Sequence, residues 1–197
     1  LLSLIWSNSH GSFLLLTTII GIYIIGELLS RKLTRKWLWY RPAGPQISNQ
    51  NLLGLLVVLI ISLLTPLLTP NGYDTYFYPF KITFGKFTNY VSEYQHFWTV
   101  WTGDWTDYVL SFTLVLMAAL FILFLFNIKR LHIRDLLLGA FFTLLALFTI
   151  RHTAIFALVA LFLIVGYTKP LFGEYRGLLR RSLLKDILVM LLIVCIV

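Results

Sequence analysis

Four short polar motifs carry the side chains that could do chemistry in this chain. Glu93, in Glu93-Tyr94-Gln95-His96, is a carboxylate that can accept a proton from a hydroxyl group. Arg151 and His152 stand between two apolar runs, and a guanidinium can bind phosphate oxygens in pairs. The other candidate binding residues are Asn8, His10 and Asn71. These residue types fit a site that holds a phosphate and activates a hydroxyl.

Each motif also has a purely structural interpretation. The polar stretch 6–11, around Asn8 and His10, can be a turn between two membrane helices. Glu93 can be a solvated loop acid, and Arg151 can anchor the chain by extending its guanidinium to the lipid headgroups. The sequence leaves both interpretations open for each motif.

Metal sites are not indicated by the spacing of the acids or by cysteine. Asp104 and Asp107 have no convergent His or further acid nearby, so they do not make a site for a hard cation. The single cysteine, Cys195, excludes an intrachain disulfide and a Cys-based metal site. Glu27 lies four residues before Arg31, so a helical ion pair explains it. No cofactor is expected, and dependence on a divalent cation stays open.

The composition indicates what kind of element must position these residues. Of the 197 residues, 59% are hydrophobic and 12% are charged, against about 45–50% and about 25% in soluble globular domains. So few charged residues cannot cover a surface in water, so the surroundings are mostly lipid. The net charge of +8 does not indicate nucleic acid, because the basic residues lie between apolar runs. Membrane lipid is the partner that this composition favours.

Long leucine-rich runs predict an all-α fold, a polytopic transmembrane helical bundle. The chain starts without Met and stops inside an apolar run, so we expect a single transmembrane domain over 1–197, truncated at both ends. The expected spans lie near residues 12–29, 52–68, 108–126, 136–150 and 153–167, with a partial span over 187–197.

The basic residues predict the orientation of this bundle. Thirteen of the sixteen Lys and Arg residues follow the first, third and fifth spans. The positive-inside rule then places these three loops on the cytoplasmic side of a cell membrane, with the aromatic loop 69–108 external. This count treats 136–150 and 153–167 as a hairpin with Arg151 at its outer tip. The alternative, one long helix with Arg151 at mid-bilayer, would cost roughly 2.5–3.5 kcal/mol.

The external loop is rich in aromatic residues. Phe80, Phe84, Phe87 and Val91 recur in it at helical spacing, which predicts an amphipathic helix over 80–91 lying in the membrane interface. An aromatic-rich cap without chemistry explains the same residues.

Arg151 needs a partner if it is held near the outer membrane surface. Glu93 is the carboxylate that the external loop offers, and a lipid phosphate is the natural ligand of a guanidinium. The sequence therefore offers Glu93 as the protein partner of Arg151, with a lipid phosphate as the other candidate.

Several of these motifs resemble, in order, those of bacterial polytopic membrane proteins described as GT-C-like. Such proteins are similar to membrane glycosyltransferases that use polyprenyl-phosphate-linked sugars. The motifs are Trp6-x-Asn8-x-His10-Gly11-x-Phe13, Gly26-Glu27-Leu28-Leu29, Asn71-Gly72-Tyr73 with Tyr78-Pro79, Ser92-Glu93-Tyr94-Gln95, and Arg151-His152 ahead of Phe156-Ala157-Leu158. The family pattern is closer to Asn-Pro-Tyr-Gly near Asn71, and it has Glu-Trp where this chain has Glu93-Tyr94.

The resemblance implies sugar transfer from a polyprenyl-phosphate-linked donor to an acceptor at the outer face of the membrane. It also implies that the principal catalytic acid lies upstream of Leu1, with Glu93 as the acid candidate within this chain. Two other classes remain open. A multi-pass transporter would use Arg151 as a charge in a water-filled cavity, and a structural membrane subunit would need no catalysis.

Overall fold

In the computed structural model the described residues are 13–37, 39–42, 46–83, 85, 91–101, 103 and 107–172. Every regular element in these ranges is a helix. The α-helices are α2 (Leu14–Lys36), α3 (Asn49–Leu64), α4 (Asp74–Thr83), α5 (Phe97–Val100), α6 (Tyr108–Phe126), α7 (Ile133–Phe148) and α8 (Thr153–Phe172). The short 3₁₀ helices are η2 (Thr65–Leu68), η4 (Ser92–Tyr94) and η5 (Ile150–His152). The expected all-α bundle is confirmed.

Four helical stretches are long and apolar enough to cross a membrane. They are Leu14–Lys36, Asn49–Leu68, Tyr108–Phe126 and Ile150–Thr168. Large apolar side chains on these stretches remain exposed, for example Ile61, Phe121 and Phe162 at 58%, 64% and 70%. Such faces suit contact with lipid tails and not with water. The chain is therefore a multi-pass membrane protein.

Local signals explain where several of these helices begin and end. The hydroxyl of Ser48 caps α3 by accepting from the amide of Asn51, and Asp107 caps α6 by accepting from the amide of Leu110. Pro66 has no amide hydrogen, and the α-helical pattern changes there to the 3₁₀ helix η2. Asp107, one of the two loop acids, thus has a structural role.

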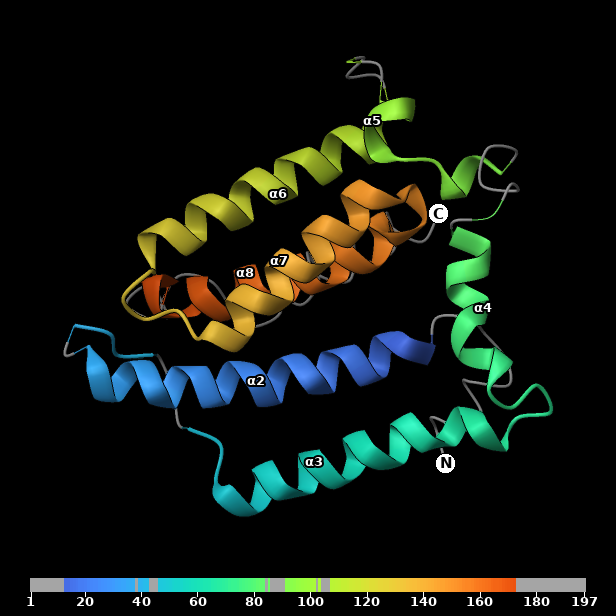
Figure 1. Cartoon of the computed structure of the whole chain (residues 1–197). Coiled ribbons are helices and arrows are strands. Elements are labelled where there is room, and N and C mark those ends of the chain that lie inside the picture. The colour runs from blue at the N-terminus through green and yellow to red at the C-terminus, as the bar shows by residue number, and fades with distance from the viewer. Residues whose placement is uncertain are drawn as a thin grey trace.

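The helices stack as layers around an antiparallel hairpin of α7 and α8. Figure 1 shows α6, the α7–α8 pair, α2 and α3 one below another, with α6 against α8 and α2 against α7. Buried residues from α6, α7 and α8 form the core: Leu116, Leu120, Leu138, Phe142, Ala146, Phe156, Ala157, Ala160 and Leu163. Alanines at three of these positions let the two hairpin helices approach closely.

The chain breaks between the two apolar runs that flank Arg151. Thr149 adopts an extended conformation, η5 follows, and α8 begins at Thr153. The hairpin, and not one long helix, is therefore the observed arrangement. Helix α7 has 16 residues, about 24 Å at ~1.5 Å per residue. It is shorter than a full span needs, and it is not among the four candidate spans.

The other expected spans shift at their ends. Helix α2 continues from the apolar run to Lys36, because Arg and Lys are good helix formers and basic residues are favoured in a last turn. Helix α8 likewise extends past residue 167 to Phe172. The partial span 187–197 lies outside the described residues.

The helix expected over 80–91 is described only in part, because residues 80–83 form the end of α4 and most of the rest is outside the described ranges. Helix α4 begins at Asp74, two residues after Gly72, whose positive φ of 49° closes the preceding turn. It contains Phe80 but ends at Thr83, and Gly85 lies in a bend. Residues 84 and 86–90 lie outside the described ranges.

Candidate functional site

The two ends of the bundle differ in character. At one end, the amide of Arg41 donates to the carbonyl of Lys129 at 2.9 Å, which brings two of the basic loops together. The turn of the α7–α8 hairpin and the segment 91–101 lie at the opposite end (Figure 1). We call the first the basic end and the second the tip end.

At the tip end, main-chain contacts join the external loop to the hairpin. The amide of Ile150 donates to the carbonyl of Gln95 at 3.1 Å. Nδ1 of His96 lies 2.7 Å from the carbonyl oxygen of Phe148, and the two rings meet edge to face with centroids 4.9 Å apart. Residues about 52 positions apart in sequence are thus fixed against one another, and the loop residues beside Gln95 are held over the hairpin turn.

Arg151 is positioned by the two residues that precede Gln95. Its Nη1 donates to the hydroxyl of Tyr94 at 2.5 Å and lies 3.8 Å from Oε1 of Glu93. Its guanidinium carbon also lies 5.4 Å from the centre of the Tyr94 ring, which is within cation–π range. The expected pairing of Glu93 with Arg151 is present. We call Glu93, Tyr94 and Arg151 the tip cluster.

The turn itself is internally bonded around His152. Nδ1 of His152 hydrogen-bonds the hydroxyl of Thr149, and the hydroxyl of Thr153 donates to the carbonyl of Ile150 at 2.8 Å. These bonds fix the turn that displays Arg151, so His152 supports the tip cluster from the next position along the chain. The side chain of Arg151 remains 32% exposed and that of Glu93 54% exposed.

The tip cluster combines three functions that a phosphate-transfer or sugar-transfer site needs. A partly exposed guanidinium can bind an anion, a carboxylate 3.8 Å away can accept a proton, and a tyrosine orients the guanidinium. Tyr94 was not among the candidate binding residues. Its position next to Glu93, in the aromatic loop, was the one signal that could have identified it.

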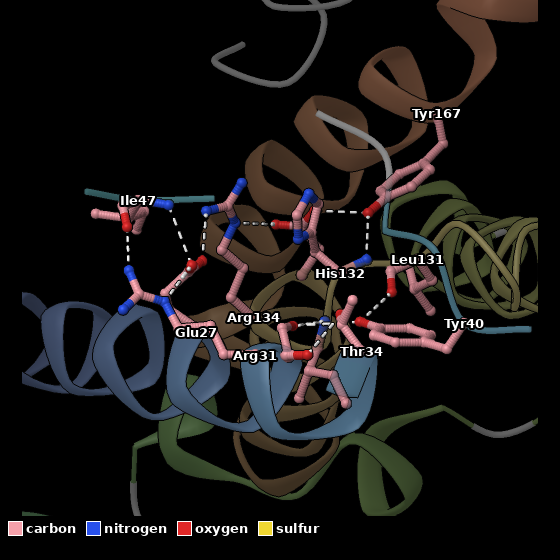
Figure 2. Close-up of polar contacts among 12 residues, drawn as sticks. Glu27, Arg31, Thr34, Tyr40, Ile47, Leu131, His132, Arg134 and Tyr167 are labelled. Carbon is pink, nitrogen blue, oxygen red and sulfur yellow. Dashed lines mark hydrogen bonds and ion pairs between the residues drawn. The ribbon is translucent and has the colours of Figure 1, made fainter. Parts of the chain in front are cut away.

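A second polar cluster, at the basic end, is larger and more buried (Figure 2). Glu27 of α2 is fully buried, at 0% exposure. Its Oε1 accepts from Nε of Arg31 and from the amide of Ile47, both at 3.1 Å. Its Oε2 accepts from Nη1 of Arg134 on α7 at 3.3 Å. The ion pair with Arg31 is confirmed, but the carboxylate also joins two further parts of the chain.

Two directed chains of hydrogen bonds extend this cluster. The amide of Ile133 donates to Ser30, which can donate to Tyr40, whose hydroxyl donates to the carbonyl of Leu131 at 2.9 Å. In parallel, the amide of His132 donates to the hydroxyl of Tyr167, and this hydroxyl donates to Asp135. These side chains satisfy the main-chain groups of the turn before α7.

The basic-end cluster is therefore a structural clamp between α2, α7 and α8. Each acid in it is already engaged by basic, hydroxyl or amide donors of the protein. An acid inside an otherwise apolar helix was the sequence signal for it. Sequence reasoning assigned that acid to a local pair because the partner on α7 is 107 residues away.

Among Asn8, His10 and Asn71, only Asn71 falls within the described ranges. Asn71 lies in the turn before α4, where its carbonyl accepts from the amide of Asp74. Asn8 and His10 lie outside the described residues. Within the described ranges, no three His, Cys, Asp or Glu side chains gather so as to hold a metal ion.

Comparison with protein-family models, with curated proteins and with solved structures finds no match to this chain.

Proposed function

We propose that the chain is part of a membrane glycosyltransferase that moves a sugar from a lipid-phosphate donor to an acceptor hydroxyl at the outer face of the membrane. One observation carries this proposal: Arg151 is held at the hairpin tip by Tyr94, 3.8 Å from the carboxylate of Glu93. An arginine that served only as an anchor would not need two oriented partners from a distant loop. The motif order that resembles GT-C-like proteins supports the same reaction class.

The tip cluster supports the reaction through two of its residues. The bond between the anomeric carbon of the sugar and the donor phosphate breaks, and the lipid phosphate leaves with its negative charge. Arg151 stabilises that charge as it develops. The oxygen of the acceptor hydroxyl forms the new glycosidic bond, and Glu93 takes its proton. Tyr94 orients Arg151 and contacts neither reacting atom.

The loop that carries Glu93 and Tyr94 also suits a lipid-borne donor. Helix α4, which begins the same loop, exposes Phe77, Tyr78 and Phe80 at 41–55%. Aromatic side chains of this kind are enriched where a membrane meets water. A phosphate on a lipid chain would lie at that level, with its isoprenoid part in the hydrocarbon. The donor then reaches Arg151 without leaving the membrane.

The proposed orientation places the tip end outside the cell. It is supported by the contact between the loops that hold Arg41 and Lys129, because two of the three basic loops thereby share the end opposite Arg151. The residues of the third basic loop beyond Phe172 lie outside the described ranges. With this orientation the basic end is cytoplasmic.

Replacing Arg151 by lysine tests the proposal. Lysine keeps the charge but cannot bind phosphate oxygens in pairs. The affinity for a polyprenyl phosphate should therefore fall about tenfold or more, which corresponds to the loss of one charge-assisted hydrogen bond. Binding to the purified protein in detergent is measured by native mass spectrometry. Lys81→Arg is the matched control, because Lys81 pairs with Asp74 on the surface of α4, and its binding should not change.

An Arg151→Lys protein that binds the lipid phosphate as tightly as the parent would overturn the clamp and leave Arg151 as an anchor. Both variants must elute from size-exclusion chromatography like the parent, so that a folding defect is not read as a binding defect.

A further inference from the structure

A stripe of basic residues lies on the face of α2 at the basic end, outside the clamp. Its members are Arg31, Lys32, Arg35 and Lys36, and together with Leu28 they line a hollow of about 470 Å³. These positions fall at helical spacing and therefore share one face of α2. Ser30 lies on the other side of the helix and is buried, and Glu27, one turn before Arg31, is buried at the edge of this face. We call this feature the basic hollow.

Arg31 forms the wall of the basic hollow nearest the clamp. All three of its guanidinium nitrogens are engaged, with Glu27, with Asn49 and with the carbonyl of Ile47. Arg31 therefore fixes the start of α3 beside α2. It shapes the hollow, and its donors already serve the protein.

The positive charges of the other three basic residues of the hollow are not neutralised by a carboxylate within the described part of the chain. Lys32, Arg35 and Lys36 are exposed, and across the described part of the chain no carboxylate forms an ion pair with any of them. Lys32 and Lys36 are one turn apart, so their like charges repel. The helix C-terminus offsets part of this cost. An anion bound between Lys32 and Lys36 would offset the remaining repulsion.

The basic hollow also lies where a helix leaves the hydrocarbon. The apolar part of α2 ends at Leu29, and its face above the hollow continues through exposed Leu28 and Ile25, at 51% and 55%. Beyond the hollow, the rings of Trp37 and Trp39 stack with centroids 5.3 Å apart and are both exposed. Exposed tryptophans typically lie at the headgroup level.

We infer that the basic hollow binds the phosphate headgroup of an anionic membrane lipid. Lys32, Arg35 and Lys36 contact the phosphate, and an acyl chain lies along Leu28 and Ile25. A free phosphate ion carries the same charge, but it would make no use of the apolar track that leads into the hollow. This site lies at the end of the bundle opposite the tip cluster and does not depend on the proposed function.

The test compares two triple variants of the whole chain in bilayers of phosphatidylcholine with phosphatidylglycerol. Lys32→Ala/Arg35→Ala/Lys36→Ala empties the hollow of its unpaired cations. Arg41→Ala/Lys129→Ala/Arg130→Ala removes as many exposed basic residues from the same end but outside the hollow. Electron paramagnetic resonance of spin-labelled lipids gives the preference of each protein for phosphatidylglycerol over phosphatidylcholine.

The hollow variant should lose at least about fivefold of this preference, the contribution of a single basic residue near a membrane surface. The control variant should stay within about twofold of the parent. An unchanged preference in the hollow variant would overturn the inference, because these residues would then not bind the lipid. An equal loss in the control would also overturn it, because any three basic residues at this end would then have the same effect.

Inorganic phosphate distinguishes the two sources of the anion. At equal ionic strength, it should displace the spin-labelled phosphatidylglycerol no more than chloride does, since both then act by screening. If phosphate displaces more of the lipid than chloride does, and the hollow variant does not show this difference, the hollow binds free phosphate. That result would overturn the inference of a lipid site.

Discussion

Replacement of Glu27 by alanine should lower the free energy of unfolding by about 3–5 kcal/mol, the cost of breaking a buried ion pair from one side. Glu27 is fully buried, and its carboxylate accepts from Arg31, from Arg134 and from the amide of Ile47. Without it, two guanidinium groups and one amide lose their acceptor inside the clamp. Helix α7 would then have no charged contact to α2 through Arg134.

This loss can be measured by chemical unfolding in detergent micelles, followed by circular dichroism. Asp74→Ala is the matched control, because Asp74 and Lys81 form an ion pair at 3.6 Å with both side chains largely exposed. Exposed pairs contribute only about 0–1 kcal/mol. Equal losses for the two variants would contradict a structural clamp at Glu27.

The second large effect is expected for Gly26→Ala, one residue before Glu27. A Cβ at Gly26 would lie 2.6 Å from the amide nitrogen and from Cβ of Arg134, and closer still to its Cα. Two of these three atoms are main chain, so a side-chain rotation cannot relieve the clash. Helices α2 and α7 must separate, which we expect to destabilise the protein by about 3 kcal/mol, at the upper end for overpacked sites.

Gly21→Ala provides the control on the same helix. A Cβ there would meet nothing within 4 Å, so alanine should be neutral or should stabilise α2 by up to about 1 kcal/mol through its better helix propensity. The same unfolding experiment compares the two variants. A Gly26→Ala protein as stable as the Gly21→Ala protein would show that α2 and α7 do not pack as closely as described.

The fold was predictable wherever one strong signal controlled a segment. Uninterrupted apolar runs predicted α3 and α6, because a long apolar helix in lipid has no competing structure. The polar pair Arg151-His152 predicted the break between α7 and α8, although no Gly or Pro marks it. The start of α4 at Asp74 was not predicted, because the turn at 70–73 was interpreted only as the end of the preceding helix.

The candidate site was predictable only in part, because tertiary contacts complete it. The charges of Glu93 and Arg151 predicted their pairing, since a cation near the membrane surface needs a partner. The role of Tyr94 depends on how the loop crosses the hairpin turn, which no local pattern encodes. The contact of Glu27 with Arg134 joins residues 107 positions apart, so the local pair with Arg31 was the only part that spacing could predict.

Photo-crosslinking tests most directly whether the tip cluster receives a lipid phosphate. A polyprenyl phosphate with a diazirine in the isoprenoid unit next to the phosphate is irradiated with the protein in proteoliposomes, and mass spectrometry locates the adducts. We expect them in 91–101 and in the turn around Arg151, which hydrogen bonds hold together. Adducts confined to other segments, such as the basic hollow on α2, would contradict the account.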